Sequence, residues 1–222
     1  MPSAEQIKRL RDLLTGSSLP VRQQGLELLV VLSPLLKDGD LAGMRMTEVE
    51  WSRQNLDGTQ LSQVDLRRAS MVRASMRGTR LCGAKLEGAL LHRADLSGAA
   101  LSGARLLDAD LSGANLCGAD LRGAALDRAS LVGARLVGVD LRETRLGESD
   151  LREADLRQSQ LRGQDLRTVR LEGADLSELW LGQVDLRGVS LDQVDLRGTD
   201  LRGALLDERL LPGAITDATT KV

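Results

Sequence analysis

The sequence predicts an all-β solenoid, a chain wound into stacked coils, rather than a globular domain with a mixed core. The first observation is a period of five residues, because one large apolar residue recurs at every fifth position from residue 41 to residue 211. The second is composition: 42% of the 222 residues are hydrophobic, yet only 1% are aromatic, with no Phe and no Tyr. A core of aliphatic side chains without large rings indicates narrow, uniform interior layers.

The period of five covers residues 39–213, which is 35 repeats without an insertion or a deletion. The central residue is Leu in 31 repeats, and the exceptions are Met46, Trp51, Met71 and Met76. Neither the period of a helix nor the alternation of a strand fits this spacing. A short extended piece followed by a tight turn does fit, since Gly often follows two residues after the Leu and Asp or Asn often precedes it.

Each repeat is expected to direct two side chains into the core, the central Leu and a small residue two positions before it. The other three positions then face solvent, which reconciles the high charge with the high hydrophobic content. Burial of one Leu stabilises a fold by roughly 1.5–3 kcal/mol, so the ladders of leucines offset much of the entropy cost of ordering the chain. These ladders are represented by Leu56, Leu96, Leu111, Leu116, Leu121 and Leu156.

Individual repeats match a known motif closely. Residues 109–113 read ADLSG and residues 114–118 read ANLCG. This pattern resembles the A(D/N)LXX motif of the pentapeptide-repeat family, and the resemblance covers residues 39–213. It implies a right-handed quadrilateral parallel β-helix with four repeats in each coil. The repeats would then form about nine coils, and at ~4.8 Å per coil the rod would be roughly 40 Å long.

Residues 1–38 lack the repeat and are expected to form a helical cap on the first coil. Ser3 and Gln6 have the spacing of a capping box at the start of a first helix. A second helix is expected at about residues 19–32, with Val30 among the residues that point inward. A cap of this kind covers apolar side chains that the first coil would otherwise expose.

The other end of the repeats differs, because outward positions become apolar before a short tail at residues 214–222. Two alternatives remain open for this end. The last residues can cap the final coil, or two copies can join end to end, as in some members of the family that the sequence resembles. The homodimer interface would be formed by Leu205, Leu210, Leu211 and Ile215.

Charge is high but balanced, with 30 Lys and Arg against 32 Asp and Glu and a net charge of −2. Such a balance gives no global field for nucleic acid or an anionic membrane, so direct binding to either is not expected. The chain has no apolar run long enough to span a membrane, and its first residues lack the layout of a signal peptide. We therefore expect a cytoplasmic protein whose two cysteines stay free.

The sequence offers no set of residues for catalysis. The single histidine, His92, directly follows a central Leu and is expected to face solvent. The aspartates recur with the repeat, so turn and coil hydrogen bonds explain them better than paired acid and base groups do. We predict no catalytic, cofactor-binding or metal-binding residues, and a function other than that of an enzyme.

The resemblance implies a protein-binding module. The best-known class of the family protects DNA gyrase and topoisomerase IV from inhibitors, with rods that resemble duplex DNA in size and negative charge. This chain is similar to members without loops, since nothing interrupts its repeats. Its evenly mixed charge favours the alternative, a structural scaffold or adaptor rod with an unrelated protein partner. The candidate partner contacts are Trp180, which stands where Asp is usual, and Asp155, Asp175 and Asp195.

Overall fold

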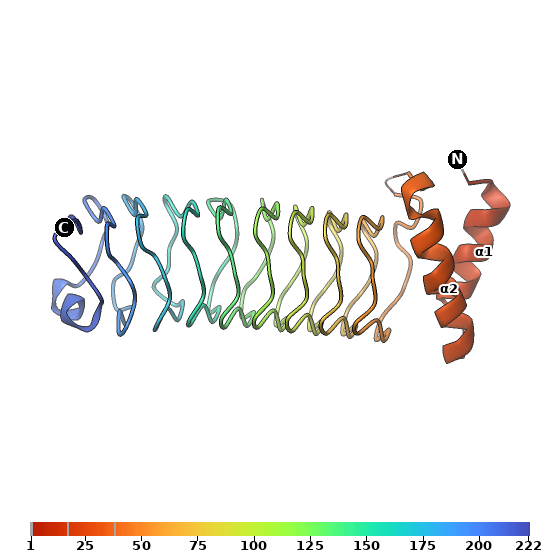
Figure 1. Cartoon of the computed structure of the whole chain (residues 1–222), viewed down its shortest axis with the longest axis horizontal. Helices are drawn as coiled ribbons and strands as arrows, with labels where there is room; N and C mark the ends of the chain where they lie inside the picture. The colour runs from red at the N-terminus through yellow and green to blue at the C-terminus, as the bar shows by residue number, and fades with distance from the viewer. Residues whose placement is uncertain (1, 17, 38) are drawn as a thin grey trace.

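The computed structural model describes residues 2–16, 18–37 and 39–222, which form an elongated stack of coils with two helices at one end (Figure 1). Successive coils are joined by parallel bridges between residues 20 apart, for example Arg45 with Asp65 and Asp65 with Lys85. Twenty residues are four repeats, so each coil has four sides. Each side contributes a single bridging residue in the described coils, rather than a strand of several residues.

A tight turn closes each repeat, as the repeat centred on Leu81 illustrates. The amide of Ala84 donates to the carbonyl of Leu81 at 3.0 Å, and Gly83 between them has a φ of +63°. Glycine adopts this left-handed conformation without strain, which explains why Gly often occupies the position. The amides of Leu81 and Gly83 donate to the carbonyls of Ala100 and Ser102, so each turn also pairs with the next coil.

The core consists of the central leucines and the small residues that precede them. The six leucines singled out from the sequence lie inside the rod and are at most 1% exposed. Leu56, Leu96, Leu116 and Leu156 belong to the same side of the rod, since they are multiples of 20 residues apart. Threonine replaces alanine in some layers, and the hydroxyl of Thr199 then donates to the carbonyl of Leu176 at 2.8 Å. This bond satisfies a hydroxyl that is buried in an apolar layer.

The first helix, α1 (Ala4–Leu14), begins with the predicted capping box, which is confirmed. The amide of Gln6 donates to the hydroxyl of Ser3 at 3.2 Å, and the amide of Ser3 donates to the Gln6 side chain at 2.7 Å. The second helix, α2 (Leu19–Leu32), packs against α1 at Gly25, where a Cβ atom would lie 2.7 Å from the backbone of Leu14. None of the described helices is long and apolar enough to cross a membrane.

The expectation that Val30 points inward is wrong, because its side chain is 38% exposed. Leu26 and Leu29 are buried and define the inner stripe of α2, and Val30 lies about 100° further around the helix than Leu29. A short 3₁₀ helix, η1 (Ser33–Leu35), follows α2. The amide of Gln60 donates to the hydroxyl of Ser33 at 2.9 Å and thereby ties the helical end to the coils.

The coil pattern changes at the C-terminal end. The five-residue period continues in the sequence there, but the backbone no longer forms the regular turns of the coil. A 3₁₀ helix, η2 (Glu208–Gly213), replaces the turns of the last repeats. The physical reason is Arg209, which falls at the small inward position, where its charge could not be buried without a partner. Its guanidinium instead pairs with Asp207 at 2.8 Å on the surface. Beyond η2 the tail rejoins the stack, with Ile215 bridging Asp195.

Candidate interaction surface

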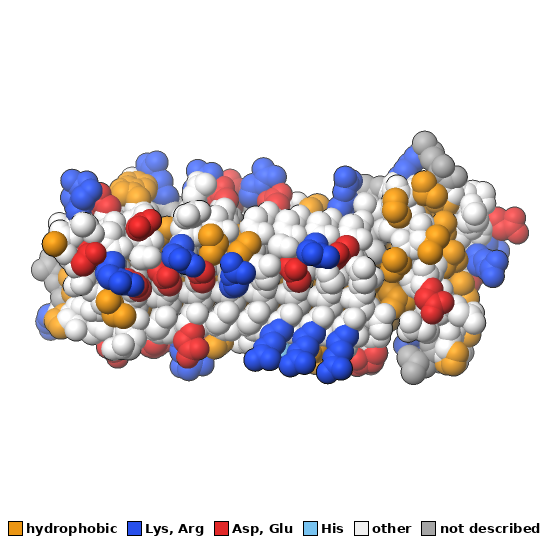
Figure 2. Space-filling model, in the orientation of Figure 1, with side chains coloured by type: hydrophobic (Ala, Val, Ile, Leu, Met, Phe, Trp, Pro, Cys, Tyr) orange, Lys and Arg blue, Asp and Glu red, His pale blue; other side chains and the backbone are white. Residues whose placement is uncertain are grey.

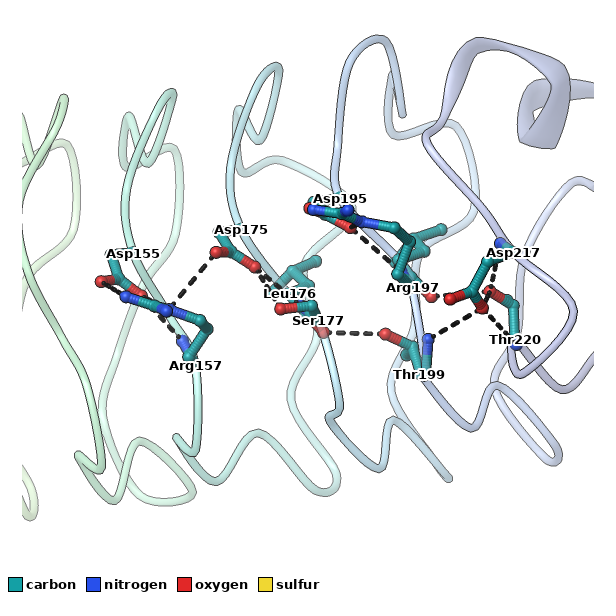
Figure 3. Close-up of polar contacts among 12 residues, drawn as sticks. Asp155, Arg157, Asp175, Leu176, Ser177, Asp195, Arg197, Thr199, Asp217 and Thr220 are labelled. Carbon is teal, nitrogen blue, oxygen red and sulfur yellow. Dashed lines mark hydrogen bonds and ion pairs between the residues drawn. The ribbon is translucent and has the colours of Figure 1, made fainter.

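Three of the candidate contact residues stack on one side of the rod. Asp155 bridges Asp175, and Asp175 bridges Asp195, so the three lie in successive coils (Figure 3). Each stands directly before an inward Leu, which holds its Cβ at the surface. The repeat therefore converts a 20-residue spacing in the sequence into a row of carboxylates at the ~4.8 Å spacing of paired strands.

Arginine side chains neutralise this row. Arg157 pairs with the carboxylate of Asp155 at 2.8 Å and with that of Asp175 in the next coil at 3.3 Å. Arg197 pairs with Asp195 at 2.5 Å (Figure 3). The hydrogen bonds from Arg157 hold the pKa of Asp155 below its ordinary value, and those from Arg197 do the same for Asp195. The row thus presents ionised but paired carboxylates rather than free negative charge.

The tail adds a carboxylate that the repeat pattern does not reveal. Asp217 accepts hydrogen bonds from the amides of Thr219 and Gly198, at 2.9 Å and 3.3 Å, and extends the row toward the C-terminal end (Figure 3). The bonds from Thr219, of which the side-chain bond is the strongest influence, lower the pKa of Asp217 to about 2. Because Asp217 lies outside the five-residue register, only its place in the folded tail brings it beside Arg197 and Glu178.

Trp180 lies on the neighbouring side, and its side chain is 48% exposed. The guanidinium of Arg162, in the preceding coil, lies 5.2 Å from the centroid of the indole ring. The same guanidinium donates from Nε to the side-chain oxygen of Gln183 at 3.1 Å. The ring also lies against Gly182, where a Cβ atom would be only 2.2 Å from an indole carbon. Arg162 therefore contacts the ring of Trp180 at the surface, and the absence of a side chain at Gly182 provides the space that the ring occupies.

A crevice opens beside Trp180, where the series of bridges is interrupted. Gln160 bridges Asp140 and Trp180 bridges Asp200, but no bridge joins Gln160 to Trp180 among these described residues. The crevice has a volume of about 280 Å³. Its lining combines cationic, amide and aromatic groups, from Arg142, Ser159, Gln160, Leu161, Arg162 and Trp180. Such a mixture suits a protein side chain better than it suits a small apolar ligand.

An unexpected residue occupies the core near this crevice. Gln164 stands at the small inward position, and its side chain is almost fully buried. The side-chain nitrogen donates to the carbonyls of Arg142 and Thr144 at 3.0 Å, and to the carbonyl of Leu141. The neighbouring bridge between residues 145 and 165 is also missing from the described series. The amide of Gln164 thus replaces backbone pairing between these two coils.

The residues expected at a dimer interface lie at the C-terminal end of the rod. Leu205 is 51% exposed and Ile215 is 41% exposed, whereas Leu211 is partly buried against the core. The side chain of Leu210 lies outside the described part of the structure. The exposed apolar groups are therefore few, and η2 covers part of the last layer.

Residues with metal-binding or redox chemistry are dispersed. Across residues 2–16, 18–37 and 39–222, no group of three or more His, Cys, Asp or Glu side chains could hold a metal ion. Cys82 and Cys117 are both free thiols and both partly buried.

The fold by itself identifies the class of protein, which is a β-solenoid with four repeats in each coil. A family model described as Pentapeptide repeats matches with 8 copies at residues 38–71, 74–107, 104–142, 130–173 and 170–207. The chain belongs to the pentapeptide-repeat family, and the prediction from the A(D/N)LXX motif is confirmed. The fold is therefore the right-handed quadrilateral β-helix of that family, whose members are in general non-catalytic repeat proteins.

Solved structures of the same family are similar to this chain. HetL, a pentapeptide-repeat protein involved in heterocyst differentiation regulation from Nostoc sp. strain PCC 7120, is 30% identical over 79% of both chains, with a TM-score of 0.38. Rfr23 from Cyanothece 51142 is 33% identical over 52% of this chain and 86% of its own, with a TM-score of 0.40. Full-length QnrB1, a plasmid-mediated fluoroquinolone resistance protein, is 18% identical over 78% of this chain and 94% of its own, with a TM-score of 0.30. No curated protein matches the sequence.

Proposed function

We propose that this pentapeptide-repeat protein is a non-catalytic rod that binds a type II topoisomerase, such as DNA gyrase, and modulates it or protects it from inhibitors. The observation that supports a protein-binding role is Trp180, a half-exposed indole fixed between Arg162 and Gly182 beside a crevice. Trp and Arg are among the residues that most often dominate the energy of protein interfaces.

Family membership and rod dimensions support the choice of a topoisomerase. The resemblance implies rods that occupy the place of duplex DNA, and about nine coils at ~4.8 Å give a length of roughly 40 Å. That length equals about twelve base-pair steps at ~3.4 Å. The proposed contact surface combines Trp180 with the neighbouring row of Asp155, Asp175 and Asp195. Because Arg157 and Arg197 pair with this row, it would supply local hydrogen-bond acceptors rather than a strong negative field.

The C-terminal end supplies a further part of the proposal, a homodimer that doubles the length of the rod. Leu205 and Ile215 are exposed apolar side chains there, and Leu211 is partly buried against the core. Light scattering at micromolar concentration tests this part directly. A dimer that Leu205→Glu converts to a monomer supports it, and a wild-type protein that is monomeric contradicts it.

A scaffold or adaptor rod with an unrelated protein partner is the second candidate. The observation that favours it is the pairing of aspartates with arginines, which leaves no side of the rod strongly acidic. A protein that imitates duplex DNA needs unpaired negative charge along its length. A flat-sided rod that presents Trp180 to another protein does not need such unpaired charge.

A supercoiling assay separates the two candidates. Purified gyrase is assayed with relaxed plasmid, with and without a quinolone, while the protein is added in increasing amounts. The topoisomerase proposal predicts restored supercoiling in the presence of the drug, or inhibition in its absence. No effect in either condition at a tens-of-fold molar excess would remove a topoisomerase partner and leave the adaptor rod.

A further inference from the structure

A row of exposed arginines runs along one edge of the coils that follow the helices. Arg53, Arg73 and Arg93 are 20 residues apart, and the amides of Arg53 and Arg73 donate to carbonyls of the next coil at 2.8 Å and 2.9 Å. All three are exposed, and their φ angles of +55° to +60° give them the same left-handed backbone at the same corner. Figure 2 shows basic side chains aligned along an edge of these coils.

Among the described residues, no carboxylate forms an ion pair with these three arginines. Arginines at the same position of the repeat, but on another corner of the rod, do form such pairs. Arg68 faces Glu48 in the preceding coil at 3.7 Å, and Arg128 faces Asp108 at 2.8 Å. At that corner, oppositely charged residues therefore occupy successive coils. Three like charges stacked at the ~4.8 Å spacing of paired strands repel one another instead.

The side that adjoins this edge carries apolar groups. Leu90 is 45% exposed, and Val72, which precedes Arg73, is partly buried. Leu90 bridges Ser70 and Asp110, while Glu50 bridges Ser70 from the other direction, so one acidic residue, Glu50 or Asp110, lies at each end of the arginine row. The middle of the surface therefore combines a cationic edge with an apolar centre.

We propose that this surface, which we call the arginine edge and define as Arg53, Arg73, Arg93, Val72 and Leu90, binds an acidic segment of a partner protein. Carboxylates of that segment would pair with the guanidinium groups, for which planar bidentate hydrogen bonds give geometric specificity. An apolar side chain among the carboxylates would cover Leu90. The arginine edge lies in the first coils, far along the rod from Trp180, and the inference does not depend on a topoisomerase partner.

An acidic protein segment fits this surface better than a nucleic acid does. Binding of single-stranded nucleic acid relies on aromatic side chains that stack on the bases. The chain has no Phe or Tyr, and Trp51 is only 3% exposed, so this part of the rod offers no stacking platform. A phosphate backbone would also leave Leu90 uncovered, and the residues from 99 to 222 carry 21 acidic against 16 basic side chains, which repels a long polyanion.

The test uses the full chain and a fluorescein-labelled peptide in which Glu alternates with Ala and a single Leu lies at the centre. Fluorescence anisotropy measures its binding to the wild type and to the triple variant Arg53→Gln, Arg73→Gln, Arg93→Gln. Gln is compatible with this backbone, because Gln63 and Gln158 have φ values of +60° at equivalent corners. The matched control is Arg122→Gln, Arg167→Gln, Arg187→Gln, which removes the same charge from arginines that already pair with Asp.

The proposal predicts that the triple variant binds the peptide at least about tenfold more weakly than the wild type, and that added salt weakens wild-type binding. The control should stay within about twofold of the wild type, because its arginines are already paired. Absence of wild-type binding, or an equal loss in the control, would overturn the proposal. Tighter binding of a labelled oligothymidylate than of the peptide would overturn it in favour of nucleic acid.

Discussion

The guanidinium of Arg162 lies over the indole ring of Trp180, 5.2 Å from its centroid, and Gly182 leaves the space that the ring needs. This relationship joins two coils at a point where the backbone bridges are interrupted. An exposed cation over an aromatic ring contributes about 0.5–1 kcal/mol, which favours the observed orientation of the ring about two- to fivefold. The contact thus favours one orientation of the exposed indole over free rotation of the ring.

Gly182→Ala should displace the ring of Trp180 without unfolding the rod, because the new Cβ would lie 2.2 Å from an indole carbon. The measurement is the emission maximum of Trp180 in a background with Trp51→Leu, which removes the second tryptophan. Gly147→Ala is the matched control, since Gly147 also follows a central Leu and its added Cβ would meet only the end of the Asp127 side chain at 3.0 Å. Equal emission for all three proteins would contradict the assigned ring position.

Leu116→Ala should destabilise the fold by about 2–5 kcal/mol, the usual cost of a cavity at a fully buried Leu. Leu90→Ala provides the comparison, because Leu90 is 45% exposed and Leu116 is 0% exposed. The same chemical change there should cost about 0.5 kcal/mol or less. Thermal unfolding of both variants checks the prediction. Equal losses would mean that the inward and outward positions of the repeat have been misassigned.

The repeat makes most of the fold predictable from the sequence. A register of 35 units determines which residues share a side, and it therefore predicts the single row that Asp155, Asp175 and Asp195 form. The two helices are predictable for local reasons, namely a capping box and a Pro near a helix start. Trp180 stands out because it breaks the pattern at a position where Asp is usual.

What the sequence could not predict lies outside the register or depends on side-chain geometry. The last repeats form η2 because Arg209 falls at an inward position. The cost of burying its charge there exceeds the gain from keeping Leu211 in a regular coil. Asp217 joins the carboxylate row through the fold of the tail. The crevice beside Trp180 and the carbonyl contacts of Gln164 depend on how neighbouring coils meet, which spacing alone does not reveal.

Gln164→Leu should destabilise the rod by about 1–3 kcal/mol, because buried carbonyls of the preceding coil would lose their donor. Gln164→Ala introduces the residue that is most frequent at this inward position and allows the coils to approach, so it should cost less than the Leu variant. Chemical denaturation of the two variants compares the costs. A more stable Leu variant would show that volume at this position matters more than hydrogen bonding.

Stability should stay constant from neutral pH to about pH 5 and then fall between about pH 4 and pH 2. Hydrogen bonds from Arg202 lower the pKa of Asp200 to about 2, and those from Arg167 lower that of Asp165 to about 2. A carboxyl whose pKa is lower in the folded state stabilises the fold above its unfolded value of ~3.9, and this contribution disappears as the pH falls through the folded pKa.

The melting temperature of the wild type and of Asp200→Asn, measured from pH 7 to pH 2, tests this assignment. The variant should melt lower at pH 7 and lose less stability than the wild type between about pH 4 and pH 2, because one of the titrating groups is gone. Asp192→Asn is the control, since no ion pair of Asp192 is found among the described residues and it is exposed. Identical pH profiles for the wild type and Asp200→Asn would refute the assigned pairing.

The most direct test of the central claim is the binding of purified DNA gyrase to the immobilised rod, compared for the wild type, Trp180→Ala and Val132→Ala. Val132 is an outward apolar residue on a different side and serves as the matched control. The account predicts saturable binding that Trp180→Ala weakens at least about tenfold and Val132→Ala changes by less than about twofold. Absence of saturable binding by the wild type, or undiminished binding by Trp180→Ala, would contradict it.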